Sequence, residues 1–113
     1  MKIVAESFAL ASFHFGLTPI EVKEMVYQAT AYLGIGRVFP FLKATNEIFT
    51  ELGIALPVQG QATTTTENRL EKGIEAQVAI FSEHMKDFYQ SGDPESKQIH
   101  YWLTDNCFGD YYM

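Results

Sequence analysis

The chain has almost no cysteine: Cys107 is the single one among 113 residues. A chain with a single cysteine can form no internal disulfide, no Cys-x-x-Cys redox pair and no zinc site built from cysteines. Cys107 lies between Asn106 and Phe108. An isolated cysteine in an aromatic setting is usually a small buried side chain, and no base adjoins this one in sequence. We therefore expect no role for Cys107 as a nucleophile, and a cytoplasmic location.

Positive charge is also scarce. Eight Lys and Arg residues face 14 Asp and Glu residues, which gives a formal net charge of -6 and a pI near 4.9. Such a chain repels phosphate backbones, so we expect no nucleic-acid partner. No apolar run reaches the length of a membrane span, so we expect no membrane partner either. The N-terminal "MKIVAESFALASFHFG" could be taken for a signal peptide, but Glu6, His14 and its helical spacing favour an amphipathic helix.

Hydrophobic residues are plentiful, at 47% of the chain with nine Phe and six Tyr, and their spacing predicts helices. The first helix carries Val4, Phe8, Ala11 and Phe15 on one stripe and ends at Gly16. The second begins with Thr18 as N-cap, Pro19 in the first position and Glu21 where a capping-box acid belongs. Its apolar seam comprises Val22, Val26, Ala29 and Leu33. A third stripe, ended by Gly53, comprises Val38, Phe41, Leu42, Thr45, Ile48, Phe49 and Leu52.

The segment 54–66, "IALPVQGQATTTT", has no helical period and is predicted to be a linker. Helical spacing resumes from residue 67 and stops at Gly92, with the apolar positions Leu70, Ile74, Val78, Phe81, Met85 and Phe88. Asp93 and Pro94 then start a short helix that carries Ile99, Trp102 and Leu103 on one side. The sequence thus predicts an all-α protein with helices in residues 1–53, a linker at 54–66 and further helices in 67–113.

Two motifs suggest ligands, and both have simpler explanations. Gly34-Ile35-Gly36 is not a dinucleotide-binding fingerprint, because a helix precedes it and Phe39 stands where the third glycine belongs. His14, His84 and His100 do not pair at helical spacing, so the sequence predicts no metal site and no cofactor. His14 differs from the other two because it lies in an apolar run. It is either a hydrogen-bonded core histidine or a general acid or base.

A row of polar groups follows one face of the second predicted helix: Glu21, Glu24, Gln28 and Tyr32. This row is either a solvated face or one wall of a site. We expect Glu21 to serve the cap, and we expect Glu24, Gln28 and Tyr32 to point toward a pocket or an interface. A carboxylate, an amide and a phenol in line could bind and polarise a small oxygenated molecule.

The segment 16–49, "GLTPIEVKEMVYQATAYLGIGRVFPFLKATNEIF", resembles the core of the carboxymuconolactone decarboxylase family, which has the alkylhydroperoxidase D-like fold. The resemblance covers about residues 8–52 and rests on Gly16, Thr18, Glu21, Val22, Glu24, Gln28, Tyr32 and Gly34. Residues 67–112 resemble the helices that precede this core in longer members. The order is therefore reversed, as in a partial or permuted copy of a tandem-domain protein.

The resemblance also implies a function. Redox members carry a Cys-x-x-Cys pair and a histidine, which would fall at Met1, Val4 and Phe8 here, so a thiol peroxidase is not expected. Decarboxylase-type members imply decarboxylation or isomerisation of a small oxygenated acid in a helical homo-oligomer, a dimer, trimer or hexamer. Glu24 and His14 would carry protons and Tyr32 would donate a hydrogen bond, although His14 stands elsewhere than the family histidine. The alternative is a non-catalytic oligomerisation or binding module that has lost the site.

Overall fold

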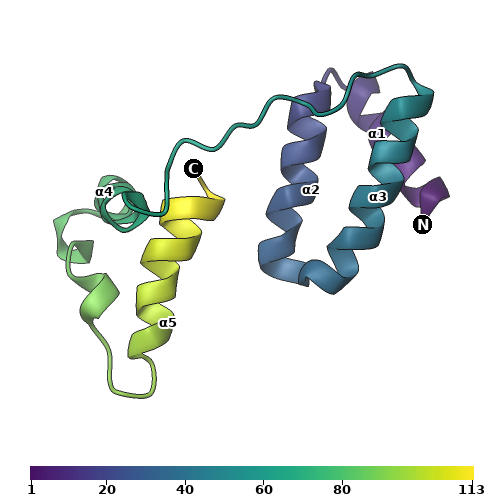
Figure 1. The fold of residues 1–113 in the computed structure, drawn as a ribbon. Coiled ribbons are helices and arrows are strands. Elements are labelled where there is room, and N and C mark those ends of the chain that lie inside the picture. Colours follow the sequence, from purple (N-terminus) through teal and green to yellow (C-terminus); the bar gives the residue numbers. More distant parts are fainter. The chain divides into compact units, whose positions relative to one another are not determined.

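A computed structural model describes all residues 1–113, and the protein is all-helical, as the sequence predicted (Figure 1). The helices are α1 (Lys2–His14), α2 (Pro19–Leu33), α3 (Ile35–Glu51), α4 (Arg69–Phe81) and α5 (Lys97–Trp102). Two 3₁₀ turns, Glu83–Met85 and Phe88–Gln90, follow α4, and a π-helix, η3 (Leu103–Tyr111), continues α5. The chain forms two compact units, unit 1 (Met1–Gly60) and unit 2 (Gln61–Met113). None of the helices has the length and apolar character needed to cross a membrane.

Unit 1 is built on α3, which packs against both α1 and α2. Figure 1 shows α2 and α3 running antiparallel, joined by a tight turn at Gly34, whose φ of +83° favours glycine. The buried core residues are small or aliphatic except for one aromatic ring: Ala5, Ala9, Val22, Ala44, Ile48 and Phe49. Apolar side chains of the segment after α3, Ile54 and Val58, pack against the same core.

The start of α2 is as predicted. Thr18 is the N-cap and Pro19 occupies the first helical position. The backbone N–H of Glu21 donates to the Thr18 hydroxyl oxygen at 3.2 Å, and the hydroxyl donates to the Glu21 carboxylate at 3.2 Å. Glu21 therefore serves the cap, which satisfies one of the amide groups left open at a helix start.

The predicted inner stripe of α1 is wrong. Ala5 and Ala9 are fully buried, whereas Val4 is 60% and Phe15 80% exposed. The buried alanines face α3, where small side chains let two helices approach closely. The larger residues of the stripe are therefore turned outward, and only Phe8 of the four keeps partial burial against the core.

Unit 2 consists of α4 crossing the continuous helix α5–η3. The crossing is very close: a methyl group on Gly73 would lie 2.0 Å from the backbone oxygen of Thr104, and one on Gly109 would lie 2.0 Å from that of Arg69. The π-helix places Thr104 and Gly109, five residues apart, on the same side, because its hydrogen bonds join residues i and i+5. Only glycine permits this approach at both positions.

The buried groups of unit 2 are polar or lack a side chain: Gly73, Gln77, Thr104, Asp105 and Gly109. The hydroxyl of Thr104 donates to the Gln77 side-chain oxygen at 2.6 Å inside this crossing. The apolar residues predicted to form the seam of α4 are only half-buried, and Phe81 is 47% exposed. Close backbone contact and hydrogen bonds therefore hold the helix crossing, in addition to the half-buried apolar side chains of this unit.

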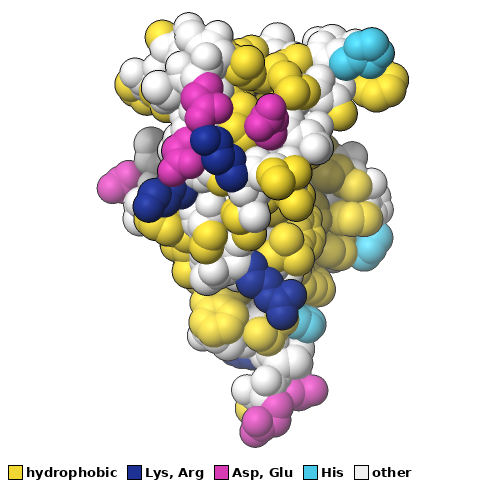
Figure 2. Space-filling view, turned by 90° about the vertical axis from the view of Figure 1, so that its right-hand side faces the viewer, with side chains coloured by type: hydrophobic (Ala, Val, Ile, Leu, Met, Phe, Trp, Pro, Cys, Tyr) yellow, Lys and Arg dark blue, Asp and Glu magenta, His cyan; other side chains and the backbone are white.

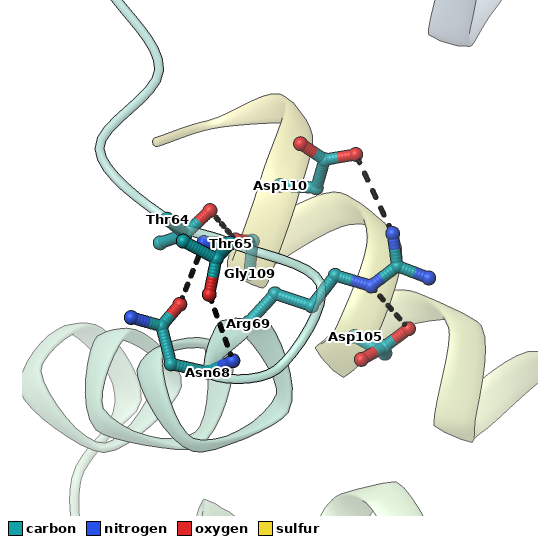
Figure 3. A network of polar contacts seen from close by, with 7 residues as sticks. All are labelled: Thr64, Thr65, Asn68, Arg69, Asp105, Gly109 and Asp110. Atoms are coloured by element: carbon teal, nitrogen blue, oxygen red, sulfur yellow. Dashed lines mark hydrogen bonds and ion pairs between the residues drawn. The ribbon is translucent and has the colours of Figure 1, made fainter.

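The threonines of segment 54–66 make specific contacts although the segment has no regular secondary structure (Figure 3). The Thr64 hydroxyl donates to the backbone oxygen of Gly109 at 2.6 Å, and the Thr63 hydroxyl donates to that of Met113 at 2.7 Å. Thr65 and Asn68 bond each other reciprocally, backbone N–H to side-chain oxygen, at 2.7 and 3.3 Å. This pair fixes the chain just before α4 begins.

Candidate functional site

The three residues predicted to act in catalysis lie in unit 1, on or beside α2. Glu24 is half-buried in the second turn of α2. Tyr32 lies in its last turn and is 66% exposed. His14 is the last residue of α1 and is exposed, with its ring edge-on to Phe15 at 5.3 Å between centroids. His14 is therefore not the buried core histidine that was one of the two sequence interpretations.

These residues do not converge within one chain. Glu24 and Tyr32 are separated by about 12 Å along the axis of α2, given the rise per residue of an α-helix. Tyr32 lies about 20 Å along that axis from Pro19, the first residue of α2, and His14 precedes Pro19 in the chain. A reacting atom held by one of these groups is therefore out of reach of the most distant one.

The polar row on α2 is only partly assembled. The Gln28 amide donates to the Tyr32 hydroxyl at 3.4 Å, a long hydrogen bond between residues one turn apart. Gln28 is half-buried, like Glu24, while the Tyr32 ring remains largely in solvent. The expected wall is thus open to solvent at its Tyr32 end in the single chain.

A lysine that sequence reasoning missed is the most unusual ionisable group of unit 1. Lys23 is only 4% exposed, and its ammonium group donates to the side-chain oxygen of Asn46 on α3. The ammonium also lies 5.6 Å from the ring centre of Tyr27 and 5.8 Å from that of Phe49, within cation–π range. No ion pair is formed by this lysine. Burial therefore lowers the pKa of Lys23 below its ordinary value.

The position of Lys23 has a sequence signal. It directly follows Val22 and stands three residues before Val26, both of which are buried, so it lies beside the apolar seam of α2. A lysine there can bury its long aliphatic stem, and here the charged end is buried as well. Its partner Asn46 also lines a shallow groove together with Lys2, Lys43, Glu47, Thr50 and Glu51.

The remaining histidines and the cysteine have local contacts. The His84 ring bonds to the Ser82 hydroxyl at 2.9 Å, and the His100 ring bonds to the Ser91 hydroxyl at 3.1 Å. His100 also stacks on Phe88, with 4.4 Å between ring centres. Cys107 is half-buried, and burial raises the pKa of its thiol, which disfavours the reactive thiolate. No three His, Cys, Asp or Glu side chains are grouped as metal ligands would be.

Unit 2 contains the densest set of charged contacts, drawn in Figure 3. Arg69, in the first turn of α4, donates through Nε to the Asp105 carboxylate at 2.9 Å and lies 3.9 Å from the Asp110 carboxylate. Asp105 is buried, so Arg69 compensates a charge that would otherwise be left unpaired. The network joins the two crossing helices, and no buried polar side-chain atom of the chain lacks a hydrogen-bond partner. We interpret it as structural.

No protein-family model, curated protein or solved structure matches the chain. The resemblance of residues 8–52 to the carboxymuconolactone decarboxylase family therefore stays a prediction.

Proposed function

We propose that this protein is a non-catalytic helical module that self-associates into a homo-oligomer. One observation carries the proposal: twenty large hydrophobic side chains are more than a third exposed, whereas the buried apolar residues number eight. All eight buried ones lie in unit 1, from Ala5 to Phe49. Where such side chains form a contiguous surface, that surface is typically covered in an assembly.

Charge supports the same proposal. Unit 2 packs through glycine and polar contacts at its closest points, α1 packs through Ala5 and Ala9, and both units leave many large apolar side chains exposed. A net charge of -6 on 113 residues disfavours random aggregation. We therefore propose that the exposed apolar surface is covered by specific self-association into a small oligomer, and not by non-specific aggregation.

Light scattering on the full chain tests the proposal. At micromolar concentration we expect a mass of at least twice the 12.8 kDa of one chain. Apolar interfaces of ordinary size give dissociation constants at or below this range. A mass of one chain over the whole accessible concentration range would contradict the proposal.

The second candidate is an enzyme of the carboxymuconolactone decarboxylase family with the alkylhydroperoxidase D-like fold. It would act on a small oxygenated acid by decarboxylation or isomerisation. The observation that favours it is the cluster on α2 of a half-buried Glu24 beside the buried Lys23, with the Gln28–Tyr32 hydrogen bond further along the helix. Glu24 would carry protons in such an enzyme, whereas His14 and Tyr32, which lie near opposite ends of α2, could not act on the same substrate atom within one chain.

Carbon dioxide release and ultraviolet absorbance, followed over a panel of small lactone and keto acids, test the enzyme. If Glu24 is a catalytic residue, Glu24→Gln keeps the shape of the side chain and removes most of the turnover, by about 100-fold or more. Glu21→Gln is the matched control, because Glu21 is on the same helix and serves the cap. No turnover by the wild type would reject the enzyme, and equal turnover in both variants would reject the catalytic role of Glu24.

A further inference from the structure

The outer face of α1 is largely apolar, and nothing in unit 1 covers it. We define this face by its exposed residues: Ile3, Val4, Ser7, Leu10, Ala11, His14 and Phe15. They recur at steps of one, three and four, so they occupy one side of the helix. The opposite side carries the fully buried Ala5 and Ala9. Thus α1 is apolar on both sides, which is typical of a helix that is covered on both sides.

The exposed area of this face suits an interface between two copies. Ile3, Val4, Leu10 and Phe15 are 80%, 60%, 45% and 80% exposed. At roughly 150–200 Å² for each large side chain, they leave about 450 Å² open. Together with the smaller residues, two such faces would bury about 1,000 Å², which is at the lower limit for a biological interface. Figure 2 looks onto the side where the N-terminus of α1 lies in Figure 1, and hydrophobic side chains cover much of it.

The sizes of the side chains favour pairing of the face with itself. Small residues, Ser7 and Ala11, lie at its centre beside Leu10, and large ones, Ile3 and Phe15, occupy its ends. Two antiparallel copies whose twofold axis passes midway between residues 7 and 11 place Ser7 against Ala11 and Ile3 against Phe15. The small centre lets the two helix backbones approach closely. The antiparallel order also sets the two helix dipoles favourably against each other.

A lipid surface is a poorer occupant. Membrane-surface helices carry several Lys or Arg residues beside their apolar face. In α1 the single lysine, Lys2, is paired with Glu51 of α3, and Glu6 adds a negative charge. The chain as a whole carries -6, which repels anionic headgroups. The face therefore fits an uncharged protein surface.

We infer that the outer face of α1 is the self-association surface of this protein, pairing antiparallel with the same face of a second copy around a twofold axis. The inference rests on the proposed function, because it names the partner and the surface of that assembly. The pairing is isologous, so each residue of the face contributes twice to the interface.

Two matched variants of the full chain test the surface. Ile3→Glu places a carboxylate on the outer face of α1, and Ile35→Glu makes the same change at an isoleucine of similar exposure, 67% against 80%, at the start of α3. Both sites are exposed, so both variants keep the fold, which circular dichroism checks. By sedimentation equilibrium we expect Ile3→Glu to weaken association by about 100-fold and Ile35→Glu to leave it unchanged.

The outcomes separate the surface from the proposed function. A monomeric wild type would reject both. If the wild type assembles and is dissociated by Ile35→Glu but not by Ile3→Glu, the proposed function stands. The outer face of α1 is then not the self-association surface. If the protein is monomeric and binds anionic vesicles in a way that Ile3→Glu abolishes, the outer face of α1 binds lipid. The antiparallel pairing of two copies is then rejected.

The orientation has its own measurement. A spin label at position 14, from His14→Cys in a Cys107→Ser background, reports the distance between copies. Antiparallel pairing separates the two labelled backbones by about 17 Å, and parallel pairing by about 9 Å, from helix rise and helix spacing. The shorter distance would overturn the antiparallel arrangement.

Discussion

The glycine crossing of unit 2 allows a sharp test of how this unit is held together. A methyl group added at Gly73 would meet the carbonyl oxygen of Thr104 at 2.0 Å, and the obstacle is backbone, which no rotamer change relieves. The helices must separate by about 1 Å or more, which is overpacking of the kind that destabilises by roughly 1–3 kcal/mol. We therefore expect Gly73→Ala to disrupt the crossing.

The size of the effect follows from the contacts that cross the interface. Separation strains the buried Thr104–Gln77 hydrogen bond of 2.6 Å, and an unsatisfied buried polar group is worth about 1–3 kcal/mol. Alanine also gains up to about 1 kcal/mol over glycine inside a helix. The net expected loss is about 2–4 kcal/mol in the free energy of unfolding of unit 2. Gly109→Ala, which would meet the Arg69 oxygen at 2.0 Å, should behave alike.

Trp102 makes the assay selective, because it is the only tryptophan and it lies in unit 2. Urea denaturation followed by its fluorescence should show a lower midpoint for Gly73→Ala. The matched control is Gly36→Ala, since a methyl group there meets nothing within 4 Å. This control should leave the Trp102 transition unchanged and raise the stability of unit 1 by about 0.5–1 kcal/mol in circular dichroism. A Gly73→Ala midpoint equal to or above that of the wild type would refute the close crossing.

Three further predictions concern single side chains. Because burial lowers the pKa of Lys23, the native state loses this proton at lower pH than the unfolded state does, so the free energy of unfolding rises as pH increases toward 10.5. Lys23→Met should abolish this rise when thermal melts at neutral and alkaline pH are compared, and an unchanged pH dependence in the variant would contradict the prediction. Thr18→Ala should lower the stability of unit 1 by about 1 kcal/mol while Thr18→Ser should not, because the hydroxyl caps α2; equal melting of both variants would speak against the cap. Because burial raises the pKa of the Cys107 thiol, iodoacetamide should alkylate it more slowly at pH 8 in the native chain than in urea, and faster native alkylation would show an activated thiolate.

The helices of unit 1 could be predicted because their signals are local. Thr18, Pro19 and Gly34 mark the two ends of α2 by capping and backbone chemistry that depends on no distant residue. The seam of α2 was also largely predictable: Val22 and Val26 are buried, although Leu33, at the end of the helix, is 56% exposed. Periodicity gives a face of a helix, and the length of the neighbouring helix decides how far along that face burial extends.

The candidate site was harder to predict, because burial of a charge depends on tertiary contacts. Lys23 adjoins the α2 seam in sequence, but the partner that accepts its hydrogen bond, Asn46, is on another helix. The polar row of Glu24, Gln28 and Tyr32 was visible from spacing alone. Its openness was not, because the exposure of Tyr32 depends on what the α2–α3 hairpin leaves uncovered.

The same reasoning explains why the stripes of α1 and α4 were misassigned. Hydrophobic size ranks Val4 and Phe15 above Ala5 and Ala9, yet the alanines are inside. In α4 the glycine Gly73 and the amide Gln77 are inside, and Phe81 is not. In both helices the inner face is chosen by how closely the backbones approach, which small residues permit and large ones prevent. A helix with small residues on one side and large apolar residues on the other thus has two surfaces to bury. In α1 the small side is used within unit 1, and the large side remains for a partner.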